Sequence, residues 1–374
     1  MEDSWGDGWN GNTFCINSEC TTLTSGFEGT DEFCIDLSIE NPITCGGGNW
    51  QEEVFWTLSD SEGTALATGG APFEGCVGGS CEPEIIESSI FNDNGQLREY
   101  YLYVPDSIQE NAPLIFVLHG YSGSAGGIMG YSQMNEVAAE EGFAVCYPQG
   151  LSDESGYNFW NVGYSFHQNQ TVDDVSFLSS LANHLQSEYN LSTENTFSTG
   201  MSNGGDMSYM LACQASDVFK AIAPVAGCMM ESIYNTCDSN PIPVLEIHGT
   251  NDNVTWWDGD MDNNDGWGAY LSTIDGIDYW VDANNCMSSE DFLLPGMGII
   301  HHRYFDCTDN VEVSLYEVVN GGHDWPGYSS QEIWSFFSQF TYNLGDVNND
   351  NAINVLDVVQ LVTLVLEGEY SSSG

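Results

Sequence analysis

The chain has 374 residues, of which 56 are Asp or Glu and only three are Lys or Arg, so its formal net charge at pH 7 is −53. Arg98, Lys220 and Arg303 cannot neutralise a row of phosphates, which excludes nucleic acid as a partner. No run approaches the roughly 18 apolar residues of a membrane span, so no membrane association is expected. A hydrophobic content of 41% is enough for one large globular domain with small satellites.

The twelve cysteines contain no C-x-x-C pair, which favours disulfides over a zinc or redox site. Disulfides require an oxidising compartment, and the first residues lack the pattern of a signal peptide, so we expect a mature, secreted, extracellular protein. The large negative charge predicts stabilisation by salt and a marine or saline environment. Proximity along the chain favours three disulfides beyond residue 82: Cys228 with Cys237, Cys286 with Cys307, and Cys146 with Cys213. Partners of the six earlier cysteines stay open.

Residues 1–82 are rich in Gly, Thr, Ser and Cys and contain short alternating runs, which predicts a disulfide-rich β-sandwich accessory module. The segment Ser-Trp-Gly-Asp-Gly-Trp-Asn-Gly-Asn at 4–12 resembles a motif of accessory modules in secreted bacterial proteins. Its Gly-Asp-Gly loop can be interpreted as a calcium site or as a tight turn capped by Asx side chains.

Residues 84–342 alternate between strand and helix patterns, which predicts an α/β fold on a mostly parallel sheet. A helix is expected from Asp173, because apolar residues from Val175 to Leu185 share one face, and another over 331–340. Expected strands cover residues 97–104, 113–118, 143–147, 196–199, 221–225, 243–247 and 311–318.

The pentapeptide Gly200-Met-Ser202-Asn-Gly204 lies between one of these strands and the helical run 205–213. This is the strand, turn and helix context of a G-x-S-x-G nucleophile elbow. Glycines flank the serine because the turn is too tight for a Cβ atom. Ser202 is therefore the predicted nucleophile.

A carboxylate and an imidazole follow two later strands. Asp252 comes just after the strand at 243–247, and His323 lies in a Gly-rich loop after the strand at 311–318. The order Ser, Asp, His is that of α/β-hydrolases. Asp258 and Asp260 are rival acids, but they lie deeper in the loop and are expected to be held less firmly.

The apolar strand at 114–118 ends in the Gly-rich loop His119-Gly-Tyr121-Ser-Gly, where this fold supplies one oxyanion-hole amide. The second amide follows the nucleophile. We therefore predict that the backbone N–H groups of Tyr121 and Asn203 form the oxyanion hole. A phosphate-binding role for these glycines is excluded, because no G-K-[ST] follows and almost no cation is available.

Several segments together resemble the polyhydroxybutyrate depolymerase and feruloyl esterase group over roughly residues 90–340. They include Arg-Glu-Tyr-Tyr-Leu-Tyr-Val-Pro at 98–105, Gly-Met-Ser-Asn-Gly-Gly at 200–205, Ile-His-Gly-Thr-Asn-Asp at 247–252 and Gly-His-Asp-Trp-Pro-Gly at 322–327. The resemblance implies an α/β-hydrolase fold and a secreted serine esterase in which Ser202, Asp252 and His323 act without a cofactor. The sequence Val-Thr-Trp-Trp at 254–257 replaces the family's valine-proline-tyrosine setting, so the substrate stays open.

Four tryptophans are candidates to line the substrate cleft: Trp160, Trp256, Trp257 and Trp325. Their flat apolar faces suit an aromatic or polyester acyl group. For Trp160 and Trp325, burial in the core is the competing interpretation.

The last segment, 344–374, resembles half of a dockerin repeat. Its oxygen-bearing residues keep the spacing of a twelve-residue calcium loop that leads into a helix at 355–366. The predicted ligands are Asp346, Asn348, Asp350, the carbonyl of Ala352, Asn354 and Asp357. Asn351 replaces the usual glycine and the second repeat is absent, so a dockerin-type protein partner is not expected.

These features predict a carboxylic ester hydrolase that cleaves polyester or aromatic esters through an acyl-enzyme. One alternative is a feruloyl or acetyl esterase acting on plant or algal polysaccharide. An alternative of another class is a catalytically inactive hydrolase fold that serves as an adhesin. The intact Ser, Asp and His set argues against the last alternative.

Overall fold

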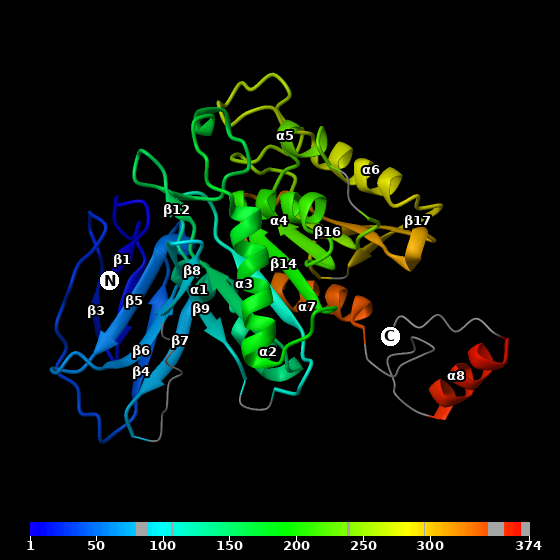
Figure 1. Ribbon diagram of the computed structural model, residues 1–374. Helices are drawn as coiled ribbons and strands as arrows, with labels where there is room; N and C mark the ends of the chain where they lie inside the picture. Colours follow the sequence, from blue (N-terminus) through cyan, green and yellow to red (C-terminus); the bar gives the residue numbers. More distant parts are fainter. Residues whose placement is uncertain (80–87, 106–107, 238–239, 295, 343–354, 368–374) are drawn as a thin grey trace.

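The computed structural model describes residues 1–79, 88–105, 108–237, 240–294, 296–342 and 355–367. Its centre is a ten-stranded sheet with the order β17-β18-β19-β16-β15-β14-β10-β11-β9-β8 (Figure 1). The six strands from β19 to β11 are parallel, and an antiparallel pair extends the sheet at each edge. The strands are β8 (Ser88–Asp93), β9 (Gln96–Tyr103), β10 (Leu114–Leu118), β11 (Ala144–Pro148), β14 (Thr196–Met201), β15 (Ala221–Val225), β16 (Val244–Gly249), β17 (Ser288–Leu294), β18 (Ile299–Phe305) and β19 (Val313–Val318).

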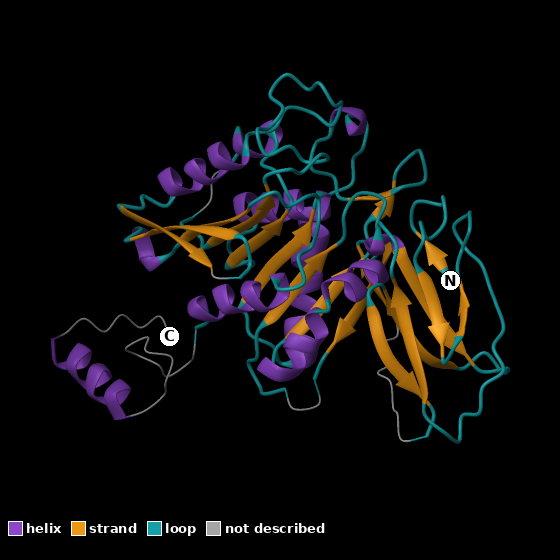
Figure 2. Ribbon diagram, turned by 180° about the vertical axis from the view of Figure 1, so that it is seen from behind, coloured by secondary structure: helices purple, strands orange, loops and turns teal. Residues whose placement is uncertain are grey.

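Helices cover both faces of this sheet (Figure 2). In β10, Leu114, Phe116 and Leu118 face one core, whereas Ile115 and Val117 face the other. A strand buried on both faces needs apolar residues at every position, which is what its sequence supplies. One core is shared with α3 (Asp174–Tyr189), α4 (Asn203–Gln214) and α6 (Thr273–Ala283), and the other with α1 (Ala125–Ser132), α2 (Met134–Glu141) and α7 (Ser329–Phe337).

Shorter elements lie in the connections between these strands and helices. They are α5 (Glu231–Tyr234), the hairpin β12 (Leu151–Ser152) and β13 (Asn158–Phe159), and the 3-10 turns η2 (Ser165–His167), η3 (Thr308–Asn310) and η4 (Ser338–Phe340). Helix α8 (Val355–Glu367) covers the predicted C-terminal helix. The predicted calcium ligands at 346–354 lie outside the described residues. None of the described helices is long and apolar enough to cross a membrane.

The N-terminal part forms two antiparallel sheets, β1-β5-β6 and β3-β2-β4-β7, that share one apolar core. Trp9 and Trp56 are buried at its centre. Their elements are β1 (Glu2–Asp3), β2 (Thr13–Ile16), β3 (Glu19–Thr21), β4 (Asn41–Gly46), η1 (Gln51–Glu53), β5 (Val54–Ser59), β6 (Ala65–Gly70) and β7 (Phe73–Val77).

The N-terminal sheets pack directly on helix α1, because that helix is rich in glycine. A Cβ atom at Gly126 would lie 2.6 Å from the Phe55 ring, and one at Gly127 would meet the carbonyl oxygen of Glu52. Gly130 lies equally close to the backbone of Gly70. Phe55 is 4% exposed and belongs to the core of the large sheet. This contact makes the N-terminal sheets part of one continuous structure with the large domain.

The disulfides differ in part from the predicted pairs. Cys286–Cys307 is confirmed, whereas Cys213 bonds to Cys237 across a Cα–Cα distance of 4.7 Å. The predictions of Cys228 with Cys237 and of Cys146 with Cys213 are therefore wrong. Proximity along the chain misled them, since α4 and α5 bring Cys213 and Cys237 together from 24 residues apart. Cys146 is buried in strand β11 as a free thiol.

The N-terminal sheets also depart from a fully disulfide-linked module. Cys15 bonds to Cys20 across the β2–β3 hairpin, whereas Cys34 and Cys45 are free. Burial raises the pKa of the Cys45 thiol to about 12, so this side chain packs as a neutral, apolar group.

A buried ion pair joins the edge of the sheet to α3. Arg98 in β9 donates from Nη2 to Asp174 at 2.8 Å, and both side chains are 1% exposed. The guanidinium also lies 3.7 Å from the centre of the Phe177 ring. Asp174 accepts a second hydrogen bond from the backbone N–H of Asn161.

Because removal of one partner leaves an uncompensated buried charge, Arg98→Met is expected to lower the free energy of unfolding by about 3–5 kcal/mol. Lys220→Met is the matched control, because Lys220 lies 3.8 Å from Glu194 in a partly exposed pair. That substitution should cost no more than about 1 kcal/mol. Urea denaturation of both variants measures the two free energies of unfolding, and an equal decrease in both would contradict the prediction.

Candidate active site

Ser202 occupies the sharp turn between β14 and α4, with φ 54° and ψ −120°. A Cβ atom at Gly200 would lie 2.7 Å from the carbonyl oxygen of Leu118, and one at Gly204 would meet the same atom. Only glycine fits at these two positions. The strain at Ser202 is retained because β14 and α4 are buried on both sides.

His323 and Asp252 come together as the sequence predicts, from the loops after β19 and β16. The Nδ1 atom of His323 lies 2.7 Å from Oδ2 of Asp252. The other carboxylate oxygen accepts hydrogen bonds from the backbone N–H groups of Val254 and Thr255, at 2.8 and 2.9 Å. Asp252 is thus held in one orientation, with Nδ1 of His323 donating to it.

The two rival acids have other partners. Asp258 is exposed. Asp260 is buried and accepts hydrogen bonds from Asn264 and from the backbone N–H of Asp265. Among the described residues, the imidazole of His323 contacts Asp252 and neither rival.

Ser202 and His323 line the same cavity, which has a volume of about 310 Å³. The loop after β10 also lines it: a Cβ atom at Gly120 would lie 3.5 Å from that of Ser202. The backbone N–H groups of Tyr121 and Asn203 make no hydrogen bond with the other described residues. Asn203 is the first residue of α4, where N–H groups have no intrahelical partner. Tyr121 lines the cavity together with Ser202, and Asn203 directly follows Ser202 in the chain, so both residues predicted to form the oxyanion hole are near the nucleophile.

Trp160 is fully buried, which overturns its predicted contact with substrate. Its indole N–H donates to the carbonyl of His119 at 2.9 Å, and its backbone N–H donates to Oδ1 of Asn203 at 2.7 Å. In return, Nδ2 of Asn203 donates to the Trp160 carbonyl. Trp160 therefore ties the loop after β10 to the start of α4 and positions both predicted oxyanion donors.

His119 also holds this loop in place. Its Nδ1 lies 2.7 Å from the Gly120 carbonyl, while Nε2 accepts the backbone N–H of Gly150 at 2.9 Å. This pattern requires a neutral ring with its proton on Nδ1. Burial, together with the nearby charge of Arg98, lowers the pKa of His119 to about 4.

The other three predicted tryptophans lie outside the cavity of Ser202. Trp256 and Trp257 are half-buried in the loop after β16, where the ring of Trp257 packs edge-on against His248. Trp325 is 5% exposed and lines a separate cavity of about 430 Å³ beside Tyr131 and Pro326. The position of a tryptophan in the sequence does not show whether its side chain is buried. This is why these three residues were predicted to line the cavity of Ser202 although they do not.

Different aromatic residues line the cavity of Ser202. Trp5 and Trp50 come from loops of the N-terminal part, and Tyr121 and Trp267 from the large domain. The ring of Trp5 stacks on that of Tyr157 with centres 4.5 Å apart. Trp5 and Trp50 are 38% and 48% exposed, an unusual state for tryptophan. No local pattern in the sequence predicts that residues so far from Ser202 share its cavity.

Two buried polar residues, His248 and Glu246, lie next to Asp252. His248 Nδ1 is 2.8 Å from Glu246 and its Nε2 is 2.9 Å from the carbonyl of Thr255. Burial raises the pKa of Glu246 to about 7. Burial alone lowers the pKa of His248, but the hydrogen bond and charge of Glu246, with Asp252, raise it overall. The Nε2 atom of His248 also lies 3.5 Å from Oδ2 of Asp252.

A family model described as Esterase PHB depolymerase matches residues 98–286, about half of the chain. The chain belongs to this family. Membership makes it a carboxylic ester hydrolase.

Curated relatives are also esterases. Feruloyl esterase D of Neurospora crassa is 28% identical over 273 residues, covering 67% of this chain and 84% of the relative. Feruloyl esterase C of Emericella nidulans is 28% identical over 271 residues, covering 70% and 89%. The bifunctional acetylxylan esterase/xylanase XynS20E of Neocallimastix patriciarum is 24% identical over 255 residues, covering 67% of this chain but only 34% of the relative.

A solved structure with the same fold is an acetyl xylan esterase from Aspergillus awamori. It covers 68% of this chain and 100% of its own, with a TM-score of 0.50 and 16% identity. At this identity the likeness concerns the fold, which is that of the α/β-hydrolases.

His119 is expected to stay neutral at pH 5, because its folded pKa is near 4. An unfolded imidazole binds its proton near pH 6.5, so stability falls as the pH decreases from about 6.5 towards 4. Long-range ¹H–¹⁵N spectra of histidine-labelled protein measure the protonation state. The signal of His119 is identified as the one that is missing in the His119→Gln variant. It should show the neutral Nδ1–H form at pH 5, and a titration midpoint near pH 6.5 would contradict the prediction.

Proposed function

We propose that Ser202, His323 and Asp252 hydrolyse carboxylic esters through an acyl-enzyme. The hydrogen bond between Nδ1 of His323 and Asp252 leaves Nε2 available for the hydroxyl proton of Ser202. Ser202 Oγ attacks the ester carbonyl while His323 takes its proton, and His323 then protonates the leaving alcohol. A water molecule repeats the sequence on the acyl-enzyme and releases the acid. No cofactor enters either step.

The N–H groups of Tyr121 and Asn203 would receive the negative charge of the tetrahedral intermediates. Two sets of hydrogen bonds support their orientation: His119 bonds to the Gly120 carbonyl, and the Trp160 backbone bonds to the Asn203 side chain. Donors fixed in advance stabilise developing charge without reorganisation, and one such donor is typically worth about 10²–10³ in rate.

An aromatic ester is the substrate class that the cavity supports best. The observation that carries this proposal is the wall of Trp5, Trp50 and Trp267 around Ser202. Asp7, Glu52 and Glu53 line the same cavity, so a free carboxylate on the substrate would be repelled. A neutral feruloyl-type ester has an aromatic ring to contact the tryptophans and no free carboxylate to be repelled. A polyester chain or an acetylated polysaccharide remains the alternative, in line with the family and with acetylxylan esterase relatives.

The disulfides and the fungal esterase relatives support secretion into an extracellular space. We propose residues 84–342 as the catalytic unit and 344–374 as a calcium-binding half-repeat. Asp357, the last predicted ligand, belongs to helix α8.

Ser202→Ala is expected to lower kcat/KM for methyl ferulate by at least about 10³, because the nucleophile is lost while the fold is kept. Asp252→Asn should also inactivate, since the imidazole would lose its orienting acceptor. Ser176→Ala and Asp258→Asn are exposed controls that should keep near-normal rates. Substantial activity in Ser202→Ala, or absence of labelling by an organophosphate probe in the parent chain, would reject the triad.

Trp50→Ala is expected to raise KM for methyl ferulate about 3- to 10-fold, because an aromatic contact is worth about 0.5–1.5 kcal/mol. Its effect on ethyl acetate should be smaller, since acetate offers no ring to stack on the indole. Ile90→Ala removes an exposed apolar side chain outside the cavity and serves as control. Equal effects of Trp50→Ala on both esters would argue against an aromatic substrate.

A further inference from the structure

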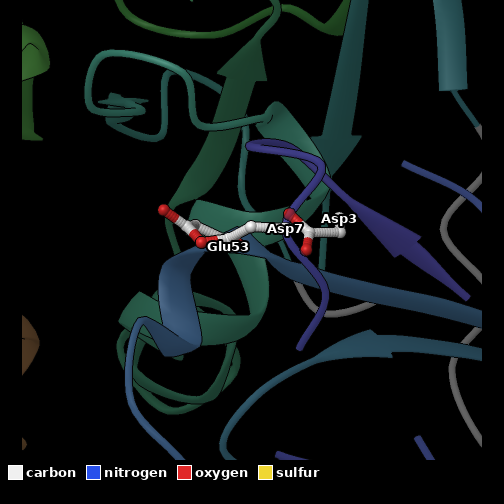
Figure 3. A group of neighbouring side chains, drawn as sticks. All are labelled: Asp3, Asp7 and Glu53. Atoms are coloured by element: carbon white, nitrogen blue, oxygen red, sulfur yellow. The ribbon is translucent and has the colours of Figure 1, made fainter. Parts of the chain in front are cut away.

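Three carboxylates meet where the N-terminal loop passes the turn η1. Asp3 is the last residue of β1, Asp7 lies in the loop that follows, and Glu53 belongs to η1; Figure 3 shows the three side chains together. One oxygen from each lies within 4.8 Å of the others. An ion bound at about 2.4 Å from its ligands, as calcium is, spans oxygens up to that separation.

Asp3 has an oxygen with no partner. The side chain is 3% exposed, and its Oδ1 accepts hydrogen bonds from the backbone N–H groups of Trp5 and Gly6, at 2.8 and 3.0 Å. Its Oδ2 is buried and makes no hydrogen bond with any described residue. An ionised oxygen in this state is costly unless something positive binds it.

Among the described residues, no Lys or Arg side chain pairs with this group. Each of these basic side chains pairs with another carboxylate: Arg98 with Asp174, Lys220 with Glu194, and Arg303 with Glu290 and Glu312. The three carboxylates therefore repel one another unless a cation or protons join them.

We propose that Asp3, Asp7 and Glu53 bind one calcium ion. Hard carboxylate oxygens suit calcium, whose flexible coordination of six to eight oxygens accepts water for the remaining positions. The ligands come from two segments about 50 residues apart, so the ion would fasten the N-terminal loop to η1.

The site adjoins the cavity of Ser202. Trp5 lies between two of the ligands in sequence and lines that cavity, as do Asp7 and Glu53 themselves. The η1 turn packs on α1 through the contact of Glu52 with Gly127. The ion thereby fixes the Trp5 ring at the rim of the cavity. Its effect on catalysis rests on the proposed function, whereas binding of the ion does not.

The experiment uses the full chain with Asp346→Asn and Asp350→Asn, which silences the predicted C-terminal loop. After chelation, calcium is titrated by calorimetry and terbium by luminescence excited through tryptophan. Asp7→Asn with Glu53→Gln tests the site. Glu19→Gln with Asp31→Asn removes the same charge from two exposed positions of the N-terminal part and is the matched control.

We expect one equivalent of calcium in the silenced chain and in the control. In Asp7→Asn/Glu53→Gln, affinity should fall at least about tenfold, and terbium emission should be lost, because two of three charged ligands are removed. No binding in the silenced chain, or unchanged binding in the double variant, would overturn the proposal. If circular dichroism shows that the double variant does not fold, calcium binding is measured in Asp3→Asn instead. Its amide oxygen can still accept the two backbone hydrogen bonds, and unchanged binding in this variant would overturn the proposal.

An activity measurement separates this inference from the proposed function. Removal of calcium should raise KM for methyl ferulate more than KM for ethyl acetate, because Trp5 loses its fixed position. A chain that binds calcium at this site but hydrolyses neither ester would reject the proposed function and leave the metal site standing.

Discussion

The turn at Ser202 packs so closely on the end of β10 that two of its residues have no room for a Cβ atom. This contact sets the distance between the nucleophile and the loop that follows β10. Because both segments start from strands buried on both faces, neither can shift without disturbing the core. The positive φ of Ser202 is the local cost of this arrangement. Trp160 and His119 then orient the loop, so the geometry of the whole site follows from one backbone contact.

A second close contact, between α1 and the N-terminal sheets, determines what surrounds the site. The glycines of α1 let Phe55 enter the core of the large sheet. The segments next to Phe55 carry Trp50, Glu52 and Glu53 to the cavity. The N-terminal part therefore acts less as an accessory module than as one wall of the site. Its acidic side chains give the cavity a negative lining, whereas its tryptophans make part of the wall flat and apolar.

The sequence predicts the central strands to within about two residues, because a strand buried on both faces is a continuous apolar run between glycines and polar turns. The pairing of Asp252 with His323 was predictable for the same reason, since both residues directly follow such strands. Contacts between segments that are distant in the sequence were not predictable. Trp5 beside Tyr157 and Cys213 beside Cys237 depend on packing that no local pattern encodes. Trp160 is misjudged because an indole suits both a core and a cleft.

The scarcity of basic residues has a consequence for how the protein can be degraded. Proteases of trypsin's specificity need an accessible Lys or Arg in an extended segment, and this chain has three such residues. Arg98 lies within β9 and Arg303 within β18, each between two neighbouring strands, and Lys220 directly precedes β15. The surface loops of the large domain carry no other cleavage point of this type. Such a protease would therefore cut only after the central sheet has opened, so that lifetime in its presence follows global unfolding and not the mobility of the loops.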